Sequence, residues 1–175
     1  MKKKTLALVL ALTLLVAGVV GGTLAWLTDQ TAEVKNTFTV GDINIDLTET
    51  TTDYKMVPGN TIAKDPTVTV KANSEACWLF VKVTESENLN NFITYTIANG
   101  WTKLQDGVYY REVPASAADQ TFSVLAGDAV TVKSDVTRTM LETAKTDAPT
   151  LTFQAYAIQK DHFATADAAW AEVSK

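Results

Sequence analysis

Short runs in which apolar and polar residues alternate constrain the fold of this chain most strongly. Ile43, Ile45 and Leu47 alternate with polar residues, and the same period of two runs from Leu151 to Ile158. This period is typical of a strand that buries one face. Similar runs recur roughly every ten residues, between turn signals and without a strand–helix–strand rhythm, and so we predict a mainly β fold, an antiparallel β-sandwich.

One run is apolar on both of its faces. Cys77 to Thr84 places Trp78 and Phe80 on one face and Leu79, Val81 and Val83 on the other. We therefore predict a central strand that is covered on both sides. Val57-Pro58-Gly59-Asn60 predicts a type II turn, because proline sets the second position and glycine supplies positive φ at the third.

The remaining runs predict further strands and two hairpins. We expect Phe92–Ile97 to pair with Gly107–Val113, and Thr121–Leu125 to pair with Ala129–Lys133. The other predicted strand is Thr67–Lys71.

Two segments have helical spacing instead. The first is Val136 to about Thr146, with Ser134 or Asp135 as its N-cap, and Pro149 follows it. The second is the alanine-rich tail Thr165–Val173, with Thr165 as its N-cap. We therefore expect two short helices beside the strands.

The first 25 residues have the layout of a secretory signal. Three lysines precede an uncharged apolar run, and Thr23 and Ala25 stand at the two positions that a signal peptidase requires to be small. We predict an N-terminal signal helix in residues 1–25, cleavage after Ala25, and a mature chain that begins at Trp26. The alternative is an uncleaved membrane anchor, because the uncharged run is long enough to cross a bilayer.

In this interpretation, we expect residues 26–35 to form a mobile segment between the signal and a β-sandwich domain at residues 36–175. Trp26, Leu27 and Val34 give the segment apolar side chains, and it could add as a strand to the open sheet edge of a neighbouring molecule. The other interpretation is a disordered leader, or a segment that packs on its own domain.

Charge and cysteine content restrict the classes of function. Removal of the three lysines of the signal leaves 12 basic against 20 acidic residues. This acidic balance disfavours nucleic acid and anionic membrane surfaces as partners. Cys77 is the only cysteine, and its apolar neighbours predict a buried, unreactive thiol. The mature protein therefore holds together without an internal disulfide.

The sequence offers no set of catalytic residues. A zinc peptidase of the usual kind needs two histidines one helical turn apart, and His162 is the only histidine of the chain. A nucleophile elbow and a glycine-rich phosphate loop are also missing. We predict a protein that is not an enzyme and that uses no metal and no cofactor, with His162 at the surface near the end of a strand.

Four segments of the chain carry a resemblance: Gly22–Asp29, Asn36–Leu47, Val57–Pro66 and Tyr156–Lys160. Together they resemble the TasA/camelysin group of exported proteins from Gram-positive bacteria. Members of this group carry an alternate signal peptide for the ER-type signal peptidase SipW. The resemblance extends over essentially the whole chain, although the length and most of the sequence differ from TasA.

The resemblance implies a jelly-roll-like β-sandwich and a secreted or cell-surface protein. It also implies a SipW-type peptidase as partner during export, contact with the membrane only through the uncleaved signal, and a biofilm-matrix or fibre subunit that assembles by strand donation. Two alternatives stay open. One is a monomeric adhesion module with an aromatic patch around Trp101, Tyr109 and Tyr110. The other is a surface metallopeptidase, as camelysin itself has been described.

Overall fold

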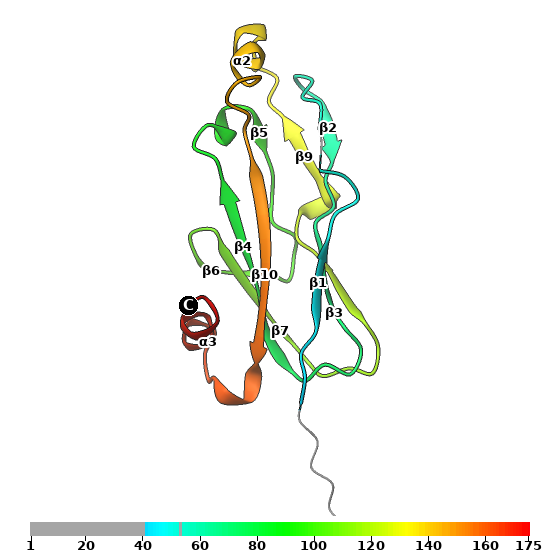
Figure 1. Ribbon diagram of the computed structural model, residues 1–175. Coiled ribbons are helices and arrows are strands. Elements are labelled where there is room, and N and C mark those ends of the chain that lie inside the picture. The colour runs from blue at the N-terminus through cyan, green and yellow to red at the C-terminus, as the bar shows by residue number, and fades with distance from the viewer. Residues whose placement is uncertain (1–40, 53) are drawn as a thin grey trace, which may run out of the picture. The chain divides into compact units, whose positions relative to one another are not determined.

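The computed structural model describes residues 41–52 and 54–175, which belong to one compact unit (Figure 1). These residues form a mainly β fold with two α-helices, as predicted. The residues predicted for signal cleavage and strand donation, Thr23, Ala25, Trp26, Leu27 and Val34, lie outside the described residues. The whole signal, the segment 26–35 and residues 36–40 of the predicted domain also lie outside them. The strands are β1 (Ile45–Thr48), β2 (Thr61–Ala63), β3 (Thr67–Val70), β4 (Cys77–Glu85), β5 (Ile93–Thr94), β6 (Thr102–Gln105), β7 (Val108–Val113), β8 (Gln120–Ser123), β9 (Ala129–Val132) and β10 (Leu151–Gln159). The α-helices are α2 (Arg138–Thr143) and α3 (Ala166–Val173). Three short 3₁₀ helices are η1 (Leu89–Asn91), η2 (Ala126–Asp128) and η3 (Lys160–His162).

The strands form three antiparallel sheets. Their orders are β1-β3-β8, β10-β4-β7-β6 and β2-β9-β5. The first two sheets pack face to face around the largest apolar core, to which β3 contributes Val68 and Val70 and β4 contributes Leu79 and Val81. All four side chains are buried because each projects from the inner face of its strand.

Strand β4 confirms the prediction of a central, doubly covered strand. It pairs with β10 on one side and with β7 on the other. The outer face of β4 carries Trp78 and Phe80, which lie beneath helix α3 in a second core. The ring of Trp170 from α3 lies 5.3 Å from that of Phe80 and 5.2 Å from that of Tyr156. Helix α3 therefore keeps Trp78 and Phe80 on the outer face of this sheet out of water.

The caps explain where the two helices begin. The hydroxyl of Thr165 accepts a hydrogen bond from the Ala168 N–H at 3.3 Å, which confirms the predicted N-cap of α3. For α2 the prediction was wrong. Thr137, not Ser134 or Asp135, is the N-cap, and its hydroxyl accepts from the Met140 N–H at 3.3 Å.

The prediction of the first hairpin was wrong, because it gave the segment Gly107–Val113 the wrong partner strand. Strand β7 pairs with β6, which lies between the two segments that were expected to pair, while β5 pairs with β9 in another sheet. The turn between β6 and β7 is the dipeptide Asp106-Gly107, and Gly107 has φ +70°. Asp-Gly is a strong two-residue hairpin signal, so the sequence contained the information that places this turn.

The predicted second hairpin was also wrong. Strand β8 pairs with β3, and β9 pairs with β2 and β5. The chain changes sheets between β8 and β9, at the fully buried Leu125 and the short helix η2. The type II turn is confirmed: Gly59 has φ +80°, and the Asn60 N–H donates to the Val57 carbonyl at 3.0 Å.

Candidate functional site

Strand β10 leaves one of its two edges unpaired among the described residues. At its two ends, the Ser86 N–H donates to the Thr150 carbonyl at 3.0 Å and the Lys160 N–H donates to the Ala76 carbonyl at 2.9 Å. Even-numbered residues therefore bond to β4, because successive residues of a strand direct their backbone groups to opposite sides. The odd-numbered residues, whose N–H and C=O groups point away from β4, are Leu151, Phe153, Ala155, Ala157 and Gln159.

Strand β1 has an open edge of the same kind. The Lys71 N–H donates to the Asn44 carbonyl at 2.8 Å, so the backbone groups of Ile45 and Leu47 point away from β3. Strands β1 and β10 run in opposite directions side by side (Figure 1). Within the described residues, no backbone hydrogen bond joins them. We call these two facing open edges, β1 with β10, the seam.

The side chains along the seam are apolar but only half-buried. Phe153, Ala155 and Ala157 of β10, with Ile45 and Leu47 of β1, pack at the margin of the largest core. Leu79 and Val81 on the neighbouring strand β4 are by contrast fully buried. The seam therefore combines unpaired backbone groups with apolar surface that water still reaches.

The β10 edge also lacks the features that protect strand edges from pairing with another chain. Its sequence, Leu151 to Gln159, holds no charged residue, proline or glycine over nine residues. The edge strand at the other side of the same sheet, β6, is four residues long, carries Lys103, and has an irregular register after that lysine. Charges, short length and irregularity discourage edge-to-edge pairing, so β10 is the edge of this sheet that is better suited to receive a strand.

A cavity of about 530 Å³ opens at one end of the seam, where β10 begins and β1 ends. Ile62, Leu89 and Val130 supply apolar lining, and Leu151 belongs both to the cavity and to the seam. The volume lies within the usual range of ligand-sized pockets.

Lys64, which lines the cavity, forms a buried ion pair with Glu49. The Lys64 ammonium lies 2.6 Å from Oε1 of Glu49, and the side chains are 8% and 17% exposed. The ammonium also lies 4.8 Å from the ring centre of Tyr54 and 5.4 Å from that of Phe153. The Tyr54 hydroxyl donates to the same Glu49 oxygen at 2.6 Å. Burial is the main cause that raises the pKa of Tyr54 well above its usual range, and this hydrogen bond to a carboxylate is the second. The positive charge of Lys64 is thus compensated by Glu49 within hydrogen-bond distance.

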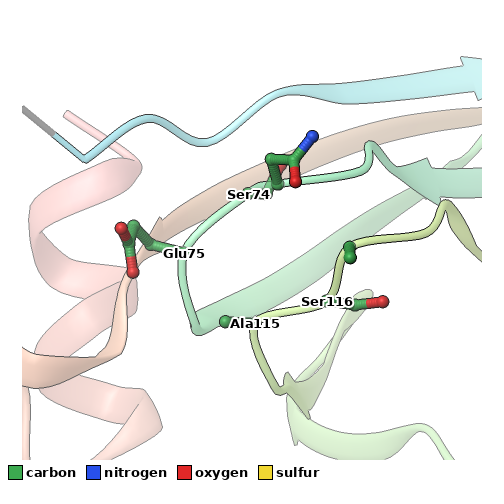
Figure 2. A pocket seen from close by; sticks show the side chains of 6 residues that line it. Ser74, Glu75, Ala115 and Ser116 are labelled. Carbon is green, nitrogen blue, oxygen red and sulfur yellow. The ribbon is translucent and has the colours of Figure 1, made fainter.

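The other end of the seam lies beside the first described residue. A Cβ on Gly41 would lie 2.8 Å from Cγ of Glu75 and 3.1 Å from Nε2 of Gln159. A shallow cavity of about 340 Å³ adjoins Glu75 (Figure 2). Small and polar residues of two loops line it, Asn73–Glu75 and Ala115–Ala117. The described chain therefore begins next to the C-terminal end of β10.

The groups considered for catalysis are scattered. His162 is exposed in η3, directly after β10. Cys77 is confirmed as buried, and burial raises the pKa of its thiol to about 11. In residues 41–52 and 54–175, no cluster of three or more His, Cys, Asp or Glu side chains is arranged to hold a metal ion. Over the same range, the helices are too short or too polar to cross a membrane.

The aromatic residues proposed for an adhesive patch do not share one surface. Tyr109 packs at the margin of the largest core, whereas Tyr110 projects from the opposite face of β7, with its ring 5.8 Å from that of Trp78. The indole N–H of Trp101 donates to the Ser123 carbonyl at 2.9 Å. Of the described large hydrophobic residues, only Val57 is exposed.

Sequence reasoning found β10 and its alternation but missed its open edge. The signal in the sequence was the uncharged run Leu151–Gln159, which is unusual for an edge strand. Recognising it as an edge required the strand order. Comparisons of the chain with protein-family models, with curated proteins and with solved structures each found no match.

Proposed function

We propose that this chain is a secreted or cell-surface structural protein of a Gram-positive bacterium, a biofilm-matrix or fibre subunit that assembles by strand addition. The observation that carries the proposal is the seam, above all the uncharged open edge of β10. In this proposal the facing sheets belong to a jelly-roll-like sandwich, and a SipW-type peptidase releases the N-terminus during export.

Two physical properties of the seam favour a strand as its occupant. Five residues of β10 offer unpaired N–H and C=O groups at the regular spacing that another strand matches. Each backbone hydrogen bond gained contributes about 0.5–1.5 kcal/mol net, and covering the half-buried apolar side chains adds to this. A small soluble ligand would satisfy few of these groups, whereas an extended segment can satisfy them all.

The experiment begins with the protein as it is secreted. N-terminal sequencing gives the cleavage site, and we expect Trp26 as the first residue. Electron microscopy and sedimentation of the same fraction then test for fibres. Deletion of residues 26–35 should leave a folded monomer that no longer sediments. A secreted chain that stays monomeric at high concentration, with or without this segment, would contradict the proposal.

Two matched triple variants test whether the apolar side chains of residues 26–35 drive assembly. Replacing the apolar residues Trp26, Leu27 and Val34 with serine should abolish polymerisation. Replacing the charged residues Asp29, Glu33 and Lys35 with serine should preserve it. Equal effects of the two triple variants would show that apolar side chains of the segment do not drive assembly.

A further inference from the structure

We infer that the cavity at the start of β10 binds a small uncharged molecule, which is mainly apolar and carries one oxygen that accepts a hydrogen bond from Lys64. This inference goes beyond the proposed function and does not depend on it, because the cavity lies within a single molecule and needs no second copy. The class of ligand follows from the walls of the cavity and from the surroundings of Lys64.

Segments that lie far apart in the sequence form the walls of the cavity. They come from the loop before β2, from β2 and β9, from η1 and β5, and from the connection between α2 and β10. Apart from Lys64, the buried lining residues are apolar: Leu89, Ile93, Val130 and Ala144. Four further lining residues are exposed: Thr52, Ala148, Thr150 and Thr152. The cavity therefore has a buried apolar floor and a more polar mouth, as ligand pockets do.

The floor of the cavity belongs to an apolar core of its own. Leu89, Ile93, Val130 and Ala144 pack together in this core, and Ile62 and Met56 lie at its margin and also line the cavity. Protein interiors are close-packed, and atoms that border a hollow lack contacts on one side. An apolar ligand would supply these contacts and would leave water on binding. The body of the ligand should therefore be aliphatic or aromatic.

Lys64 provides the polar contact for the ligand. Among the described residues that line the cavity, it is the only charged one, and its side chain is 8% exposed. An ammonium group has three donors. Within the described part of the chain, its one oxygen partner is Oε1 of Glu49 at 2.6 Å, and its other close neighbours are the rings of Tyr54 and Phe153. A buried donor is stabilised by an oxygen acceptor, so a ligand oxygen can add a second hydrogen bond.

The ion pair with Glu49 determines the charge of the ligand. Glu49 is 17% exposed, and the Tyr54 hydroxyl donates to the same carboxylate oxygen at 2.6 Å. A carboxylate ligand on Lys64 would lie close to Glu49 and would leave one uncompensated negative charge in a buried place. A cationic ligand would be repelled by Lys64. A carbonyl or hydroxyl oxygen accepts the hydrogen bond without changing the balance of charge.

Octanamide and octanoate test the class of ligand, because they share chain length and shape and differ in charge. In calorimetric titration of the secreted full-length mature chain, octanamide should saturate a single site. Octanoate should bind at least about tenfold more weakly. The methyl NMR signals of Ile62, Leu89 and Val130 should shift on saturation with octanamide. Heat that does not saturate with octanamide, or octanoate binding of equal strength, overturns the inference.

Glu49→Gln tests the role of the ion pair. This variant leaves the positive charge of Lys64 without a carboxylate, so octanoate should bind at least about tenfold more tightly than it binds the unmodified chain. It should also bind more tightly than octanamide does. If the order of the two probes is unchanged in the folded variant, the assignment of Lys64 and Glu49 is overturned.

A second matched pair tests the location and leaves the ion pair intact. Ala144→Leu adds apolar atoms to the floor of the cavity and should weaken octanamide binding at least about tenfold. Thr146→Leu changes an exposed residue nearby that does not line the cavity, and it should leave the affinity within about twofold of the original. Equal affinities of the two variants overturn this cavity as the site, even if Glu49→Gln does not fold. Fibre formation by the same samples is a separate measurement that tests the proposed function alone.

Discussion

Proline at Ala155 and Ala157 should block assembly without unfolding the subunit. Both residues have odd numbers, so their N–H groups point into the seam and make no bond to β4. Proline is tolerated on an edge strand when the lost N–H faces outward, and it favours an extended residue before it. The double variant should therefore keep the urea midpoint of the monomer close to that of the unmodified chain.

The expected effect on assembly follows from the two lost donors. Each inter-subunit hydrogen bond contributes about 1 kcal/mol, so two lost bonds cost about 2 kcal/mol. This cost raises the threshold concentration for polymerisation roughly 30-fold. Sedimentation over a dilution series measures the threshold, and urea unfolding of the soluble fraction measures the stability.

The neighbouring residue provides the control. Gln154 has an even number and bonds to β4, so Gln154→Pro removes a hydrogen bond inside the domain and should lower the urea midpoint. If the double variant of Ala155 and Ala157 stays folded and polymerises at the unmodified threshold, the assignment of the β10 edge as the assembly site is refuted.

Three further predictions concern the domain itself. Glu49→Gln should lower the free energy of unfolding by about 3 kcal/mol, because Lys64 keeps a buried charge without its partner; a loss under about 1 kcal/mol in urea unfolding would contradict this. Gly107→Ala should lower the free energy of unfolding by at least about 2 kcal/mol, because φ at this position is +70° and the new Cβ would lie 2.6 Å from a backbone oxygen. Gly59→Ala has open space around it and should lower the free energy of unfolding by only about 1 kcal/mol. Equal urea midpoints for the two variants would be inconsistent with this reasoning. Burial raises the pKa of Cys77 from 9.0 to about 11, so between these pH values the native state keeps a thiol proton that the unfolded chain releases. The free energy of unfolding should therefore fall as the pH rises from about 9 to 11. A chain with Cys77→Ala should lack this part of the decline.

Several local features could be predicted because neighbouring residues alone decide them. Thr165 caps α3 through an N–H three residues away, and the type II turn depends only on Pro58 and Gly59. The alternation of β10 and the double apolar character of β4 are likewise properties of continuous sequence.

Strand partners could not be predicted in the same way. Strand β9 follows β8 closely in the chain, yet it pairs with β2 and β5, because the buried Leu125 and η2 redirect the chain into another sheet. The short hairpin of β6 and β7 was missed because the run around Phe92 offered a more apolar partner than Thr102–Gln105. Pairing is decided by burial over the whole domain, which a local pattern does not contain.

The sequence by itself determined which segments extend, which faces are apolar and where α3 begins, since these depend on side chains within a few residues of one another. Only the tertiary structure decided that β10 is an edge, that β1 lies beside it without hydrogen bonds, and that Lys64 meets Glu49 at the end of their seam. The physical reason is that an open edge is defined by a missing neighbour, and whether a strand has a neighbour depends on how all the other strands have paired.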